Sequence, residues 1–345
     1  MAVLFVLIDH VLVFFGEPQT WFFQPRVLGI LGVLLFFVHT CLVLMFSLER
    51  QEAKFGRAKM FRIFMIRRCF RVYPLTMLIV TLIYVFGIPQ ADVRTYGFGP
   101  MSLDFGGYIA NLFLVHNITD TRSILLPLWS LPYEMQMYLF LPALFLWIRS
   151  VQSLKLLLAL WAVSMVLSIA QFTTGVQPKL LWLVPAFFPG VIAYWVSRHS
   201  APKLPFWLFA AGLIVGALIF MAAPGPGATF KGMPFCLALG LMLPLFREVQ
   251  HTRVRRVSHL LAKYSYGIYM THMLCQWAAF VYLRHLAFPL QAAIFVVLLA
   301  GIPVVLYHAV ESPMIRFGNR VVEKRYRERG AEPSTVLATD AASVP

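Results

Sequence analysis

The chain has 345 residues, of which 60% are apolar and only 12% are charged, and its mean hydropathy is +0.77. This composition is typical of a polytopic membrane protein, so the number of domains does not follow from the length. A net charge of +15 would suggest nucleic acid as the partner of a soluble protein. Here the cations fall in short segments between apolar runs, as membrane insertion requires, and we exclude nucleic acid.

Ten apolar runs follow one another along the chain, and we predict an all-α polytopic membrane protein with about ten transmembrane helices. The runs cover residues 2–16, 27–48, 72–88, 129–148, 154–171, 180–196, 206–222, 232–246, 264–283 and 290–310. Several runs are close to the lower limit of about 17 residues at which a helix spans a bilayer.

The Lys and Arg residues divide unevenly between the two sides of these predicted helices. Of the 29, 23 fall on one side and six on the other. Because cytoplasmic segments of membrane proteins are enriched in Lys and Arg, we predict that both termini are cytoplasmic. We expect residues 1–330 to form one membrane domain, and residues 331–345, rich in Ala, Ser, Thr and Pro, to be a disordered cytoplasmic tail.

The most basic segment is a predicted cytoplasmic loop that ends at the block FMIRRCFRVYP, residues 64–74. If the block is helical, Arg67 and Arg68 each share a face with Arg71, and Tyr73 and Pro74 open the next helix. Because Arg makes planar bidentate contacts with phosphate, the three side chains are candidates for an anion site at the membrane surface. The alternative is loop charge that only fixes the orientation of the protein.

Two further features limit the interpretation. The longest predicted external connection, residues 89–127, contains an apolar patch at 108–115 that is too short to span, so it is a candidate re-entrant segment or lid. The four cysteines have neither metal-ligand spacing nor paired spacing, so we interpret them as core residues and expect no metal site. They are Cys41, Cys69, Cys236 and Cys275.

Ionisable residues inside the predicted helices are few, and each one is costly unless it faces a partner or a cavity. They are Asp9, His10, His39, Glu134, His272, His308 and Glu311. For any single neutral His, a packed and hydrogen-bonded structural role is the better explanation, whereas the carboxylate of Glu134 needs a partner. Glu134 shares a helix face with Ser130 and Tyr138. Tyr269 and His272 share another, so these groups could line a passage from the Arg cluster toward the outer surface.

Five sequence blocks occur in order along most of the chain. They are GVLLFFV at 32–38, RRCFRVYP at 67–74, WSLPYEMQMY at 129–138, SYGIYMTH at 265–272 and ESP at 311–313. Together they resemble the blocks of the acyltransferase-3 family of integral membrane acyltransferases, which acylate sugars and other hydroxyl acceptors. The chain departs from the family pattern at Leu34, where the family has Asp, at 39–41, where it has Leu-Ser-Gly, and at Met137, where it has Phe.

The resemblance implies roles for particular residues. The RxxR pair, Arg68 and Arg71, is associated in the family with the acyl-CoA donor, and we include Arg67 in the same site. The family's catalytic His lies in the first helix about ten residues after an Arg, which makes His10 the candidate general base. Counting back from His10 passes Met1, so we expect the first helix to be truncated and the true start to lie upstream. The alternative is that His39 has taken over the catalytic role.

The resemblance therefore implies a membrane-embedded O-acyltransferase of the bacterial inner membrane. It would move an acyl group, most simply acetyl, from cytoplasmic acyl-CoA to a hydroxyl of a lipid-linked or exported carbohydrate, with no bound cofactor. Glu134 would orient a hydroxyl or the imidazole. The candidates for the channel or acceptor site are Ser130, Tyr138, Tyr269, His272 and His39. The alternative from another class is a secondary transporter or lipid flippase, in which the same His and Glu residues form a proton relay.

Overall fold

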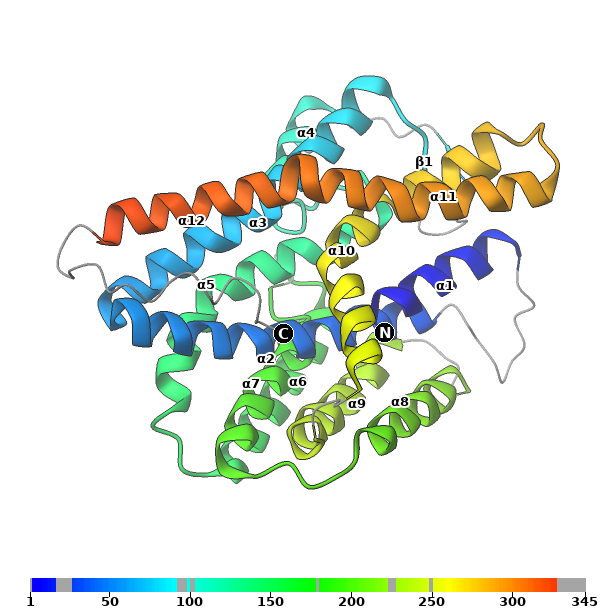
Figure 1. Cartoon of the computed structure of the whole chain (residues 1–345). Coiled ribbons are helices and arrows are strands. Elements are labelled where there is room, and N and C mark those ends of the chain that lie inside the picture. The colour runs from blue at the N-terminus through cyan, green and yellow to red at the C-terminus, as the bar shows by residue number, and fades with distance from the viewer. Residues whose placement is uncertain are drawn as a thin grey trace.

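The computed structural model of the chain describes residues 2–16, 27–91, 98–99, 103–177, 180–222, 228–247 and 251–327. Within these residues the protein is helical apart from turns, connections and a hairpin of two short antiparallel strands, β1 (Gln90–Ala91) and β2 (Phe98–Gly99) (Figure 1). The all-α prediction is therefore confirmed. The predicted tail, residues 331–345, lies outside the described residues.

Every predicted apolar run contains a helix. These helices are α1 (Ala2–Phe14), α2 (Val27–Phe55), α3 (Arg57–Phe86), α5 (Leu131–Ile148), α6 (Leu154–Thr174), α7 (Val184–His199), α8 (Phe206–Met221), α9 (Ala228–Met242), α10 (Thr252–Gln276) and α11 (Phe288–Leu306). The remaining elements are α4 (Phe105–Leu112), the 3-10 helices η1 (Leu126–Ser130) and η2 (Leu243–Leu245), the π-helical turns η3 (Trp277–Tyr282) and η4 (Tyr307–Glu311), and α12 (Ser312–Arg327).

Four described helical stretches are long and apolar enough to cross a membrane. They are Val27–Phe55, Arg57–Phe86, Leu154–Thr174 and the continuous stretch Phe288–Tyr326. Three shorter apolar helices accompany them, at Ala2–Phe14, Phe206–Met221 and Thr229–Leu245. The count of about ten spans and the side on which the termini lie stay predictions.

The basic segment that we predicted as a loop is helical instead. α2 continues to Phe55 and α3 begins at Arg57, so only Gly56 separates them. Gly56 has a φ of +80°, a conformation that glycine adopts without steric cost. Pro74 lies inside α3 and does not open a new helix, so this prediction was also wrong. The apolar pattern ends where the charges begin, but Lys and Arg are good helix formers, and the helices therefore extend beyond the apolar runs.

α11 and α12 run end to end along one edge of the molecule and are joined by η4 (Figure 1). α12 packs along the basic half of α3. At this contact the rings of Phe70 and Phe317 lie 5.4 Å apart, and a side chain at Gly318 would collide with Phe70. The basic ends of α3 and α12 are thus side by side.

The core forms around α2, which packs against α1, α3, α7 and α9. The rings of Phe37 and Phe187 stack at 4.1 Å between α2 and α7. A Cβ at Gly190 would lie 2.5 Å from the Val38 carbonyl oxygen, so glycine is what allows these two helices to approach. Because lipid is as apolar as the core side chains, close packing of this kind holds membrane helices together.

Two ion pairs join the end of α2 to neighbouring helices. Glu52 pairs with Arg149 after α5, and Glu49 pairs with Arg198 in α7. The C-terminal ends of α2, α5 and α7 thus meet at one end of the bundle.

The segment between α3 and α5 folds back along α3. Tyr108 in α4 hydrogen-bonds Thr81 at 3.0 Å and stacks on Tyr84, while Tyr73 donates to the Phe113 carbonyl at 3.2 Å. From the rise of ~1.5 Å per residue, Tyr73 lies roughly 20 Å from the end of α3. This geometry fits the re-entrant alternative better than the lid, because non-helical backbone at membrane depth must be buried in protein.

Candidate active site

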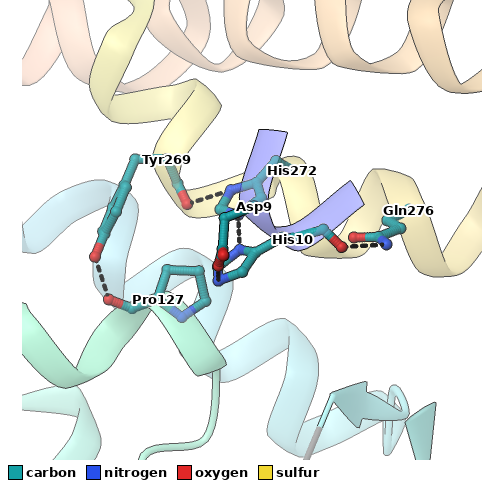
Figure 2. Close-up of polar contacts among 6 residues, drawn as sticks. All are labelled: Asp9, His10, Pro127, Tyr269, His272 and Gln276. Atoms are coloured by element: carbon teal, nitrogen blue, oxygen red, sulfur yellow. Dashed lines mark hydrogen bonds and ion pairs between the residues drawn. The ribbon is translucent and has the colours of Figure 1, made fainter. Parts of the chain in front are cut away.

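His10 and His272 meet where α1 crosses α10 (Figure 2). His10 Nδ1 lies 2.7 Å from His272 Nε2, and the planes of the two rings are nearly parallel, at 9°. The side-chain amide of Gln276 donates to the His10 carbonyl at 3.1 Å. His10 and His272 are 8% and 2% exposed, so the pair lies in the protein interior.

His272 is held from its other side by its own helix. Its Nδ1 lies 2.8 Å from the carbonyl oxygen of Tyr269 and 3.1 Å from that of Ile268. Both contacts reach back one turn of α10, which fixes the plane of the imidazole ring. We predicted His272 only as a residue lining the channel, and its direct contact with His10 was not predicted.

Asp9 is the third ionisable group at this point, and we assigned it no role from the sequence. Its Oδ2 lies 3.8 Å from His10 Nε2, and the residue is 2% exposed. A Cβ at Gly29 would lie 2.5 Å from that Oδ2, so the space for the carboxylate depends on glycine in α2. The signal for Asp9 was present, because it is a carboxylate at membrane depth beside the predicted base.

Tyr269 connects the His pair to the start of α5. Its hydroxyl donates to the Pro127 carbonyl at 2.7 Å (Figure 2). The same hydroxyl lies 2.8 Å from the Ser130 hydroxyl. The Tyr269 and His272 rings lie 6.2 Å apart. The structure therefore brings together the predicted site residues Ser130, Tyr269 and His272 from two distant parts of the chain.

Glu134 belongs to a separate cluster one turn further along α5. Its carboxylate accepts a hydrogen bond from the Tyr138 hydroxyl, and both side chains are buried. The Arg68 guanidinium lies over the Tyr138 ring, 6.0 Å from its centroid, and interacts electrostatically with Glu134. Glu134 also interacts electrostatically with Arg71, and none of its described contacts is with His10. The carboxylate has the partner that a buried charge requires.

The three basic residues of the predicted anion site point in different directions. Arg68 is half-buried against Glu134 and Tyr138, Arg67 is half-buried with its guanidinium 5.7 Å from the Phe55 ring centroid, and Arg71 is exposed. Arg71 also interacts electrostatically with Glu311, which is 2% exposed in η4. Glu311 was recognised as an ionisable residue in a predicted helix and as part of the block ESP, but its interaction with Arg71 was not predicted.

The comparison with known families decides the class of protein. A model of the acyltransferase-3 family, described as an acyltransferase domain, matches residues 1–308. The chain belongs to the acyltransferase-3 family. It is therefore an acyltransferase of the membrane, and the transporter or flippase alternative is set aside. No curated protein and no solved structure matches the chain.

His39 does not join the site of this acyltransferase. It is exposed on α2, and the contact of Asp9 with Gly29 fixes how α1 lies against that helix. From the rise of ~1.5 Å per residue, His39 lies roughly 15 Å along α2 from Gly29. The geometry therefore favours His10 over His39 as the base.

The described part of the acyltransferase contains no group of three or more His, Cys, Asp or Glu side chains that could hold a metal ion. Its polar groups instead form two neighbouring clusters. One holds Asp9, His10 and His272, and the other holds Arg68, Glu134 and Tyr138. Ser130 and Tyr269 lie between them.

Proposed function

We propose that this acyltransferase moves an acyl group, most simply acetyl, from acyl-CoA on the cytoplasmic side to a hydroxyl of a lipid-linked or exported carbohydrate in the bacterial inner membrane. The observation that carries the proposal is the buried contact between His10 and His272, with Asp9 beside it. A neutral imidazole at this position is the kind of group that acts as a general base near neutral pH.

In the proposed reaction, His10 takes the proton of the acceptor hydroxyl as its oxygen attacks the carbonyl carbon of the thioester. The bond between carbon and sulfur then breaks, and His10 gives the proton to the departing thiolate, which becomes free CoA thiol. The products are an ester and CoA, so no further reactant is needed. General base catalysis of this kind typically contributes about 10²- to 10⁴-fold to the rate.

The basic residues would hold the donor. Arg71 is exposed and Arg67 is half-buried on the neighbouring turn, which supports a role for both in binding the phosphates of CoA. Arg68 turns inward toward Glu134 and Tyr138, so we place it further along the path, where the thioester end of the donor would pass. Glu134 would then keep the Arg68 guanidinium in position.

The acceptor would approach from the opposite side, along the segment that folds back beside α3. Ser130 and Tyr269 lie next to the His pair and offer hydroxyl groups that can bond a sugar hydroxyl. Tyr138 lies in α5, about two turns beyond Ser130 at the end of η1, and would mark the boundary between the donor and acceptor paths.

The proposal is tested with inside-out bacterial membrane vesicles that contain the protein. Acetyl-CoA carrying a radiolabelled acetyl group is added, and label in the lipid-linked carbohydrate fraction is measured together with free CoA thiol. We expect both to rise together, and vesicles carrying His10→Gln at the same protein level to show neither. Equal label and equal thiol in the two preparations would contradict the proposed function.

A further inference from the structure

We infer that His272 is a positioning residue, which holds His10 in the tautomer with its proton on Nδ1 and so makes Nε2 the basic atom. This inference rests on the proposed function for its catalytic consequence. Its structural part, the tautomer of His10, can be measured without any acyl transfer.

The surroundings of His272 determine which of its two ring nitrogens carries the proton. Its Nδ1 faces two backbone carbonyl oxygens, of Tyr269 and Ile268, at 2.8 and 3.1 Å. A carbonyl oxygen only accepts hydrogen bonds, so Nδ1 must be the nitrogen that carries the proton. In a neutral imidazole the other nitrogen, Nε2, then holds the lone pair.

The tautomer of His272 determines the tautomer of His10. His272 Nε2 can only accept, and its partner at 2.7 Å is His10 Nδ1, so His10 Nδ1 must donate. A neutral His10 therefore has its lone pair on Nε2. That nitrogen faces away from α10 and toward Asp9, whose Oδ2 lies 3.8 Å from it.

In this tautomer, Nε2 of His10 is the atom that can take the proton of the acceptor hydroxyl. When Nε2 takes a proton from the acceptor hydroxyl, the imidazolium keeps its bond to the neutral Nε2 of His272. A carboxylate within about 4 to 6 Å favours this charged form, and Asp9 lies within that range. The alternative tautomer would place a proton on the atom that must act as the base. In a catalytic triad, a partner that leaves the His in the wrong tautomer lowers kcat by about 10⁴-fold.

The variants that separate positioning from packing are His272→Gln and His272→Leu. Gln can offer its amide oxygen where His272 Nε2 lies, whereas Leu fills a similar volume without an acceptor. We expect His272→Leu to lower kcat by at least about 100-fold with the donor KM nearly unchanged, and His272→Gln to stay within about tenfold of the wild type. Equal activity of the two variants at equal membrane levels would overturn the inference.

The tautomer itself is read by nitrogen NMR of the purified full-length protein, labelled at histidine and dissolved in detergent. The His10 signals are identified by their loss in His10→Gln. We expect a protonated Nδ1 and an unprotonated Nε2 in the wild type and in His272→Gln. A proton on Nε2 in the neutral wild-type protein would overturn the inference even if acyl transfer occurs. The expected tautomer in a protein that transfers no acyl group would overturn only the proposed function.

Discussion

At the residue scale, Arg68 and Arg71 have the same charge and lie one turn apart, yet their surroundings differ. Arg68 is turned inward over Tyr138 and toward Glu134, whereas Arg71 is exposed. The helical spacing predicted that the two share a face, but only the packing of α5 against α3 shows which of them is turned toward Tyr138 and Glu134. The consequence is that the two residues should differ in function.

Substitution of each Arg by Ala tests this difference. A charge-assisted hydrogen bond contributes about 1.5 to 3 kcal/mol, so Arg71→Ala should raise the donor KM by about 10- to 150-fold with kcat less affected. Arg68→Ala should lower kcat as well, because it removes the inward-facing guanidinium of the Glu134 cluster and leaves Glu134 with Arg71 alone. Steady-state kinetics in membranes measures both, with Arg62→Ala on the same helix as the control. An unchanged donor KM in a correctly inserted Arg68→Ala, Arg71→Ala double variant would contradict the role in donor binding.

Glu134→Gln tests whether the charge of Glu134 matters. The amide keeps the volume and can still accept the Tyr138 hydroxyl, but it no longer balances Arg68. We expect activity to fall by at least about tenfold with the protein still inserted, because a buried unpaired guanidinium costs several kcal/mol. Glu52→Gln, which breaks an ion pair at the end of α2, serves as the control. Near-normal turnover of Glu134→Gln would assign Glu134 a structural role only.

The pairing of His10 with His272 shows the limit of prediction at this scale. Their residue types and their depth in apolar runs marked both as candidates from the sequence. Their contact joins positions 262 residues apart, and no helical period relates them. Asp9 was visible for the same reason as His10, but its orientation toward Nε2 follows from the glycine at position 29.

At the scale of elements, apolar runs predicted where helices occur but not where they end. α2, α3 and the stretch from α11 to α12 all continue into basic segments. The hydrophobic pattern shows which residues lie within the bilayer, whereas a helix ends where its backbone hydrogen bonding ends. Lys and Arg are good helix formers and do not end it. The fold of residues 103–130 was least predictable, because its backbone is held by tertiary contacts such as that of Tyr73 with the Phe113 carbonyl.

A matched pair of cysteine variants tests whether α4 enters the membrane. Phe105 and Phe113 are both exposed, at the start of α4 and just after its end. If the segment is re-entrant, a membrane-impermeant maleimide added from outside should label Phe105→Cys and leave Phe113→Cys unlabelled. Labelling after solubilisation in detergent shows that both thiols are reactive. Equal labelling of the two variants in intact cells would indicate an external lid instead.

At the scale of the whole molecule, the charge distribution predicts the orientation. Of the 29 Lys and Arg residues, 23 lie on the side predicted to be cytoplasmic. A fluorescent protein that folds only in the cytoplasm, fused after residue 345, should therefore be bright. A periplasmic phosphatase inserted after Thr119 should be active. An inactive phosphatase together with a dark fusion would contradict the predicted topology.

The whole proposed mechanism depends on His10 acting as the base of an acyl transfer. The most direct measurement is the rate at which vesicles release CoA thiol from acetyl-CoA, compared at equal protein levels for the wild type, His10→Gln and His39→Gln. We expect His10→Gln to lose at least about 100-fold in rate and His39→Gln to lose less than about tenfold. An active His10→Gln variant beside an inactive His39→Gln variant would contradict the account.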